Sequence, residues 1–111
     1  DLGPAQRNVV IFTAKVSKKN IAKYQELMDS EDGLTVTRNA DGCTHLEAFY
    51  NEETQTYFIY EYWDSYEQYE TYLNWRFNED SSKLVAKATK LVIGGEKGMQ
   101  AHFNNTYYKF F

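Results

Sequence analysis

The chain has 111 residues, of which 12 are lysine or arginine and 16 are aspartate or glutamate, so its formal net charge is −4. This acidic balance, without any run of basic residues, argues against a nucleic-acid partner. No apolar run approaches the roughly 20 residues that a membrane helix needs, and no signal-peptide pattern is visible. Cys43 is the only cysteine, and a lone thiol fits a reducing compartment. The composition therefore predicts one cytoplasmic domain with no membrane partner.

The first part of the chain predicts a strand followed by helical segments. Residues 8–16 are mostly β-branched or aromatic and are apolar on both faces, which is typical of a strand covered on both sides. Ser17 is a candidate N-cap for a helix over residues 18–29, where apolar side chains recur at helical spacing. A short second helical piece is expected between residues 30 and 39, before the turn signal of Asp41-Gly42.

The middle of the chain predicts an antiparallel hairpin. Residues 43–50 alternate between two faces, and simple alternation puts Cys43 together with His45 and opposite Leu46. A polar connector of hairpin length leads to the next strand, over residues 56–63. The two faces of that strand are formed by Tyr57, Ile59, Glu61 and Trp63, and by Phe58, Tyr60 and Tyr62.

The last part of the chain predicts two helices and a strand. Ser65 is a candidate N-cap, with Gln68 at the capping-box position, for an aromatic helix that ends near Phe77. A further helix is expected over residues 82–92, before a glycine pair that ends it. Residues 99–103 alternate like a fourth strand.

The order strand, helix, strand, strand, helix, strand is typical of the ferredoxin-like α+β fold with a four-stranded antiparallel sheet. We expect a single domain over residues 1–111, in which residues 1–7 form an N-terminal extension. The apolar tail, residues 104–111, is expected to dock on the domain or on a partner.

The predicted sheet leads to a prediction about assembly. In this fold both helices cover one face of the sheet, and a face left in water should be polar. Here the first and third strands are apolar or aromatic on both faces, and monomers rarely expose such a patch. We therefore expect a homodimer in which two sheets meet face to face, as a dimeric α+β barrel.

Short motifs then indicate a family. Gly42-Cys43 enters the second strand, Glu61-Tyr62-Trp63-Asp64-Ser65 ends the third, and Tyr72-Leu73 lies on the following helix. With these motifs the chain resembles the antibiotic biosynthesis monooxygenase family, whose members are dimeric α+β barrels. The matching segment is similar to the family's Glu-x-Trp-x-Ser signature followed by a tyrosine–leucine pair.

The resemblance implies a chemistry without metal or flavin. A small aromatic or quinol-like compound is deprotonated, and its anion passes an electron to O₂. Such chemistry needs an apolar pocket, a base whose pKa lies near the working pH and donors for an oxyanion. We therefore expect no cofactor and a small apolar or aromatic molecule as partner. The alternative is a non-catalytic dimer that binds such a molecule. Haem degradation is disfavoured, because the resemblance implies a histidine between residues 64 and 92, where there is none.

The expected catalytic residues combine a base, a pocket tryptophan and donors for an anion. Each has a structural alternative: an exposed strand histidine, a core tryptophan, a core tyrosine, or an arginine paired with Glu79 or Asp80. No metal ligands are expected, because the histidines are far apart in sequence and Cys43 is alone. The catalytic candidates are His45, Trp63, Tyr72 and Arg76, and the substrate-binding candidates are Asn8, Tyr62, Tyr69 and His102.

Overall fold

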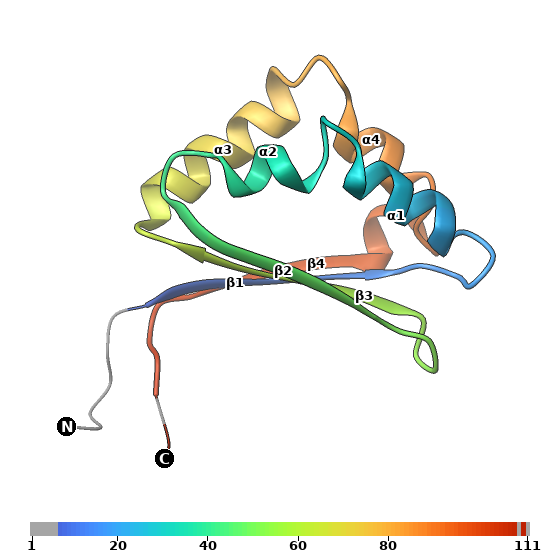
Figure 1. The fold of residues 1–111 in the computed structure, drawn as a ribbon, viewed down its shortest axis with the longest axis horizontal. Helices are drawn as coiled ribbons and strands as arrows, with labels where there is room; N and C mark the ends of the chain where they lie inside the picture. Colours follow the sequence, from blue (N-terminus) through green and yellow to red (C-terminus); the bar gives the residue numbers. More distant parts are fainter. Residues whose placement is uncertain (1–6, 109, 111) are drawn as a thin grey trace.

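A four-stranded antiparallel sheet carries helices on one of its faces (Figure 1). The structure, a computed structural model, describes residues 7–108 and 110, so all of the predicted extension over residues 1–7 except Arg7 lies outside the described part. The elements in chain order are β1 (Asn8–Lys15), α1 (Ile21–Asp29), α2 (Leu34–Arg38), β2 (Cys43–Asn51), β3 (Thr56–Trp63), α3 (Tyr66–Asn78), α4 (Leu84–Thr89), a 3₁₀ turn η1 (Gly95–Gly98) and β4 (Met99–Asn104).

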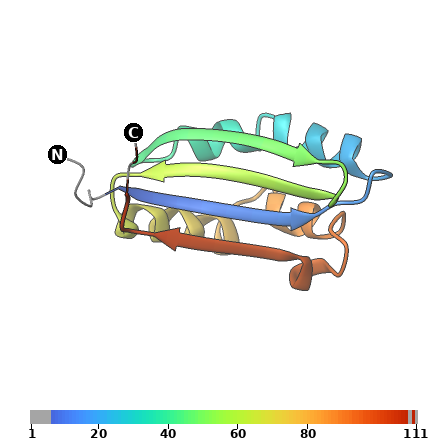
Figure 2. The same ribbon diagram turned by 90° about the horizontal axis from the view of Figure 1, so that it is seen from below.

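The order of strands across the sheet is β2-β3-β1-β4, and all neighbours are antiparallel. This order is visible from below the sheet, where β1 lies between β3 and β4 (Figure 2). The hairpin β2–β3 therefore occupies one side and the two terminal strands the other. The predicted ferredoxin-like fold is confirmed.

Local hydrogen bonds and backbone angles decide where α1, α3 and α4 begin. Ser65 caps α3 as predicted, and its hydroxyl accepts a hydrogen bond from the backbone N–H of Gln68 at 3.2 Å. The first helix starts at Ile21, later than expected from residue 18, because Ser17 instead closes a turn by accepting from the N–H of Asn20. Lys83 has a left-handed φ of 58°, so α4 begins only at Leu84.

Successive side chains of β2 depart from the predicted alternation between the two faces at one point. A register shift between Cys43 and His45 marks a β-bulge, which turns the strand by one residue. Cys43 is therefore buried on the helix side with Val10 and Trp63, whereas His45 points to the other face. The prediction that Cys43 and His45 share a face was wrong, because strict alternation fails at a bulge.

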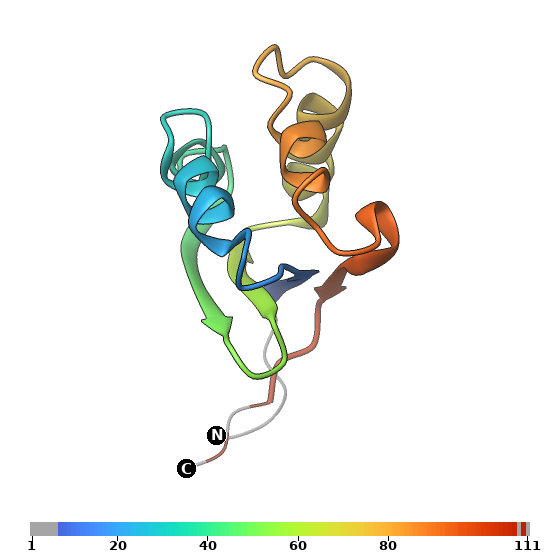
Figure 3. The ribbon, with the colours of Figure 1, turned by 90° about the vertical axis from the view of Figure 1, so that its right-hand side faces the viewer.

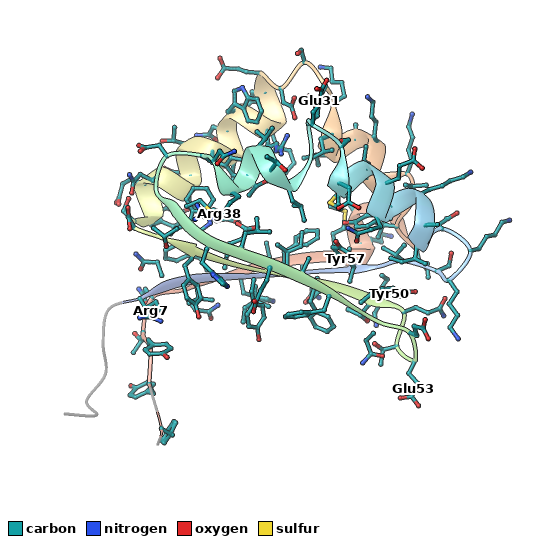
Figure 4. The ribbon with its side chains drawn as sticks, viewed as in Figure 1. Arg7, Glu31, Arg38, Tyr50, Glu53 and Tyr57 are labelled. Carbon is teal, nitrogen blue, oxygen red and sulfur yellow. The ribbon has the colours of Figure 1, made fainter. Side chains whose placement is uncertain are left out.

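The core lies between the sheet and the helices in two adjoining clusters. The larger one includes Tyr24 on α1 and Tyr57 on β3, whose rings meet edge to face with centroids 4.9 Å apart. Figure 4 shows Tyr57 on the helix side of the sheet. The smaller cluster contains Val10, Cys43, Trp63 and Tyr69. Of the aromatic residues of β3, Tyr57 and Trp63 therefore face the helices, whereas Phe58, Tyr60 and Tyr62 face the opposite side of the sheet.

The other face of the sheet, here called the open face, is covered by none of the helices in the described residues. Figure 4 shows side chains standing below the sheet as well as above it. The rings of Phe49 and Tyr60 lie 5.5 Å apart there, and Phe49 is 46% exposed. The strand pairing places these residues on the open face: Val9, Ile11, Thr13, His45, Glu47, Phe49, Phe58, Tyr60, Tyr62, Gln100, His102 and Asn104.

The described residues that follow β4 leave the sheet on the side of the open face, away from the helices (Figure 3). The guanidinium group of Arg7 lies 5.2 Å from the ring centroid of Tyr62 and 4.7 Å from that of Tyr107. Beyond Tyr107 the described residues Tyr108 and Phe110 are 61% and 87% exposed. Docking of the whole tail stays a prediction, and residues 109 and 111 lie outside the described part.

Tyr57 offers a direct test of the helix-side core. We expect Tyr57→Ala to lower the free energy of unfolding by about 3–5 kcal/mol, because a buried ring is removed. Tyr57→Phe keeps the ring and loses only the hydrogen bond from its hydroxyl to Gln25, so its cost should be about 1 kcal/mol. Urea unfolding measures both. Equal costs for the two variants would contradict the packing described here.

Candidate active site

An internal cavity of about 210 Å³ lies between the sheet and the helices. It is lined by residues of β1, β3 and β4 from below and of α1, α2, α3 and α4 from above, and most of them are apolar. Figure 3 shows α1 and α2 on one side and α3 and α4 on the other, both above the sheet. The lining residues with polar side-chain groups are Tyr24, Thr37, Glu61, Tyr69, Tyr72 and Arg76.

Glu61 is the acidic residue of this cavity. It lies in β3 opposite Val10 of β1 and Leu46 of β2, so its neighbours across the sheet are apolar. Its side chain is 6% exposed, and its Oε1 accepts a hydrogen bond of 2.9 Å from the indole Nε1 of Trp63. Among the described residues no other group donates to this carboxyl, so Oε2 is left for a ligand.

Burial sets the acidity of Glu61. Removal from water disfavours the charged form and raises the pKa of this carboxyl from 4.5 to about 7, although the hydrogen bond from Trp63 and the charge of Arg76 act in the opposite direction. A carboxyl group with this pKa exchanges its proton near neutral pH, as a general base must. Such a perturbed acid in a cavity is a candidate catalytic group.

Trp63 fixes one end of the site. It is 3% exposed on the helix side, and its ring centroid lies 5.4 Å from those of both Tyr69 and Tyr72. Tyr69 in turn stacks on Phe103 of β4 at 5.8 Å. The predicted residues Trp63, Tyr69 and Tyr72 are therefore brought together by β3 and α3. Trp63 belongs to the core and also holds the carboxyl of Glu61.

Tyr72 is held by two hydrogen bonds at its hydroxyl. The Nε of Arg76 donates to it at 2.7 Å, and Thr37 lies 2.5 Å away, where either hydroxyl can be the donor. Burial raises the pKa of Tyr72, against the effect of its hydrogen bonds with Thr37 and Arg76. The phenol therefore stays protonated and can donate a hydrogen bond when Thr37 supplies the other proton.

Arg76 connects the site to the loop between α1 and α2. Its side chain forms a buried ion pair with Asp80, at 2.9 Å. A guanidinium group has five N–H donors, and protein atoms accept from all of them. The acceptors are the backbone oxygens of Asp32 and Gly33, Oδ2 of Asp80, Oγ1 of Thr37 and the hydroxyl of Tyr72. No N–H group of Arg76 is left for an anionic ligand.

The remaining predicted site residues lie elsewhere. Asn8, His45 and Tyr62 line a shallow polar depression at the end of the sheet, where Asn8 donates to the backbone oxygen of Asp64 at 2.9 Å. His45 lies 3.5 Å from Glu47 and its ring is 4.8 Å from that of Tyr62. His102 is exposed on β4 beside Gln100. The structure therefore puts both histidines on the open face and not in the internal cavity.

Sequence reasoning did not nominate Glu61. The signal was present, because Glu61 shares a strand face with Tyr57, Ile59 and Trp63, all of which are buried. A carboxylate within an apolar strand face is expensive to bury and therefore points to a function or to a partner. The structure supplies the partner, Trp63, and the cavity into which the second oxygen is free to bind.

Over residues 7–108 and 110 no group of three or more His, Cys, Asp or Glu residues could hold a metal ion. In the same part of the chain no helix is long and apolar enough to cross a membrane.

The fold and the cavity together define a ferredoxin-like α+β protein with an acid held between sheet and helices. The family described as antibiotic biosynthesis monooxygenase matches residues 8–76, from the start of β1 to Arg76. The chain therefore belongs to the antibiotic biosynthesis monooxygenase family, and the predicted membership is confirmed. Among proteins with curated descriptions none matches the chain significantly.

Several solved structures share the fold at low sequence identity. A monooxygenase from Streptomyces coelicolor, in complex with the ligand nanaomycin D, has a TM-score of 0.73 and 18% identity, covering 96% of this chain and 92% of its own. A candidate antibiotic biosynthesis monooxygenase from Deinococcus radiodurans has a TM-score of 0.72 and 16% identity, with 93% and 95% covered. A dimeric ferredoxin-like protein from an uncultured marine organism has a TM-score of 0.71 and 17% identity, with 96% and 92% covered.

The raised pKa of Glu61 predicts a pH dependence of stability. Between pH 4.5 and about 7 the folded protein keeps a proton that the unfolded chain has released. The stability contributed by Glu61 is therefore fully present below this window, falls as the pH rises through it and is constant above it. Relative to Glu61→Gln, the wild type should lose about 3 kcal/mol across the window.

Urea unfolding of both proteins at several pH values measures this difference. Glu53→Gln, at the exposed tip of the β2–β3 hairpin (Figure 4), controls for the loss of one carboxyl group. Wild-type and Glu61→Gln profiles that run parallel through the window would show that the carboxyl is not perturbed.

Proposed function

We propose that this protein is a monooxygenase that needs no cofactor and acts on a small aromatic or quinol-like compound. The observation that carries the proposal is the Glu61 carboxyl, which is buried in an apolar cavity and has a pKa of about 7. A base of this kind removes a phenolic proton near neutral pH and leaves the phenolate in a site with little water. Membership of the monooxygenase family supports the same reaction type.

The reaction balances with O₂ alone for a phenol that bears hydrogen on its para carbon. Glu61 takes the phenolic proton, and the phenolate passes one electron to O₂. The radical pair then combines to a peroxide at the para carbon, which receives the proton back. Loss of water forms the second carbonyl of a quinone. One oxygen atom stays on the substrate and the other leaves as water, so the substrate supplies all four electrons and no reductant is required.

The neighbouring residues have distinct roles in this proposal. Tyr72 donates a hydrogen bond to the substrate oxygen and stabilises its anion. Trp63 holds Oε1 of Glu61, so that Oε2 faces the substrate. Arg76 is a positioning residue, because it fixes the Tyr72 hydroxyl and its N–H groups are all occupied by protein atoms. Tyr69 forms part of the aromatic wall.

A purely binding role is the alternative, and the cavity lining bears on it. A cavity that only stores an apolar molecule has no use for a buried acid, which costs stability when it is charged. Glu61 and the polarised hydroxyl of Tyr72 line this cavity, and their presence favours catalysis over storage. The S. coelicolor relative holds nanaomycin D, which supports a small organic ligand for this fold.

We also propose that the open face is the interface of a homodimer. Its middle rows carry Ile11, Phe58 and Tyr60, none of which has a helix above it. Burial of such surface stabilises by roughly 25 cal/mol per Å². The marine relative is a dimeric ferredoxin-like protein, which supports two sheets packed face to face. The described residues that follow β4 leave on the same side (Figure 1) and are suitably placed to contact the partner.

A charge in the middle of the open face should separate the dimer. We expect the wild type to sediment as a dimer at micromolar concentration and Phe58→Glu as a folded monomer, because a carboxylate facing a second sheet has no counter-charge. Phe77→Glu is the matched control: it makes the same change at a more exposed phenylalanine on α3, and should remain dimeric. A wild type that sediments as a monomer would contradict the proposed interface.

Oxygen uptake tests the proposed reaction. With a panel of quinols, anthrones and phenols that bear hydrogen on the para carbon, such as 1-naphthol, we expect the wild type to consume O₂ above the buffer rate with the phenols of one or two rings and to form the quinone. Glu61→Gln should lower the rate by about 10²–10⁴-fold, the usual range for removal of a general base. His45→Gln and His102→Gln should keep the rate, because both side chains lie on the other face of the sheet.

These variants also separate the candidate bases. Loss of uptake in a histidine variant, with Glu61→Gln unaffected, would assign the reaction to the open face instead. No uptake above buffer by a correctly folded wild type, over the whole panel, would contradict the enzyme proposal and favour the binding protein.

A further inference from the structure

The volume of the internal cavity limits the size of its ligand. It measures about 210 Å³, whereas an apolar cavity of about 150 Å³ holds one benzene ring. A compound of one or two rings therefore fills the cavity, and a flat compound of three rings exceeds it. The walls are side chains of both the sheet and the helices, so a larger ligand either displaces packed elements or leaves part of its rings in solvent at the open end.

The cavity has an apolar outer end and a polar inner end. Phe77 of α3 and Ala101 of β4 line it and are exposed, Phe77 by 65%, so the cavity meets solvent between these two elements. Glu61 lies in the middle of the sheet and is 6% exposed. A ligand that enters past Phe77 therefore reaches the carboxyl of Glu61 with its leading end, and its remaining atoms lie among apolar side chains.

The charges around the cavity exclude an anionic ligand. Arg76 is the one basic residue among the described lining residues, and all five of its N–H groups donate to protein atoms. A carboxylate in the cavity would face Glu61 without a free cationic donor. Two like charges in a site removed from water repel strongly. A neutral ligand that donates a hydrogen bond meets no such cost.

We propose that this cavity selects neutral hydroxyarenes of one or two rings, bound hydroxyl group first, and excludes carboxylated ones. The hydroxyl donates to Oε2 of Glu61 and accepts from Tyr72, while the rings contact the apolar wall. The proposal rests on the monooxygenase function inferred above and specifies its substrate class. It concerns binding, so it is testable without the reaction.

Three probes with the same ring system separate charge and hydrogen bonding. They are 1-naphthol, 1-methoxynaphthalene, which lacks the donor, and 1-naphthoate, which is anionic. Calorimetric titration without oxygen at about pH 8, above the pKa of Glu61, measures their affinities. We expect 1-naphthol to bind at least ten-fold more tightly than either of the others, because only it satisfies the carboxylate. 1-Anthrol, a hydroxyarene with three rings, tests size and should bind at least ten-fold more weakly than 1-naphthol.

Variants connect these affinities to named residues. In Glu61→Gln the preference for 1-naphthol over 1-naphthoate should shrink to less than about three-fold, because the repelling charge is gone. Glu47→Gln makes the same chemical change on the open face and should keep the wild-type ratio. Phe77→Ala, at the exposed outer end, should improve 1-anthrol binding at least ten-fold. The wild-type titrations decide the proposal even if a variant does not fold.

The outcomes are distinct for the two proposals. 1-Naphthoate or 1-methoxynaphthalene binding as tightly as 1-naphthol would overturn the substrate class. Selective binding of 1-naphthol, without oxygen uptake from any compound in air, would contradict the monooxygenase function and leave the selectivity intact. Oxygen uptake only with carboxylated or three-ring compounds would support the monooxygenase function and contradict the selectivity.

Discussion

The burial of one carboxyl group governs the proposed chemistry of this protein. Glu61 lies in the central part of a sheet whose helix side is otherwise apolar, and a single hydrogen bond from Trp63 holds it. Removal from water raises the pKa of Glu61 to about 7, whereas in water the same group would be charged and a weak base. In the proposed reaction, the cavity, the aromatic wall and the hydroxyl of Tyr72 all position the substrate that this carboxyl deprotonates.

The charge of Arg76 suggests that it binds an anionic ligand, but its hydrogen bonds hold helical segments together instead. Its guanidinium group joins α3, the loop before α2 and Asp80, so the helical layer above the cavity is tied together at one point. A buried ion pair of this kind adds little net stability but loses much when one partner is removed. All five N–H groups of Arg76 donate to protein atoms. Its positive charge therefore acts on the electrostatics of the site, but none of its N–H groups binds a ligand. The selectivity against anions follows from that saturation.

The same strands form both the helix side and the open face of the sheet. In β3, Tyr57, Ile59 and Glu61 face the helices, whereas Phe58, Tyr60 and Tyr62 face the open side. Strand alternation alone produces this division, and it explains why aromatic residues are so dense between Phe58 and Trp63. The aromatic residues of α3 continue the cavity wall, since Tyr69 and Tyr72 both contact Trp63.

The sequence by itself determined the strand order, the capping of α3 by Ser65, the two apolar faces of the sheet and the family, because periodicity and local capping depend on near neighbours along the chain. Only the tertiary structure decided that a bulge turns Cys43 into the core, that both histidines stand away from the cavity and that Arg76 has no N–H group to spare. It also brought Glu61 beside Trp63, Tyr72 and a cavity. Burial and pKa are properties of what surrounds a side chain in space, and residues far apart in sequence provide that environment.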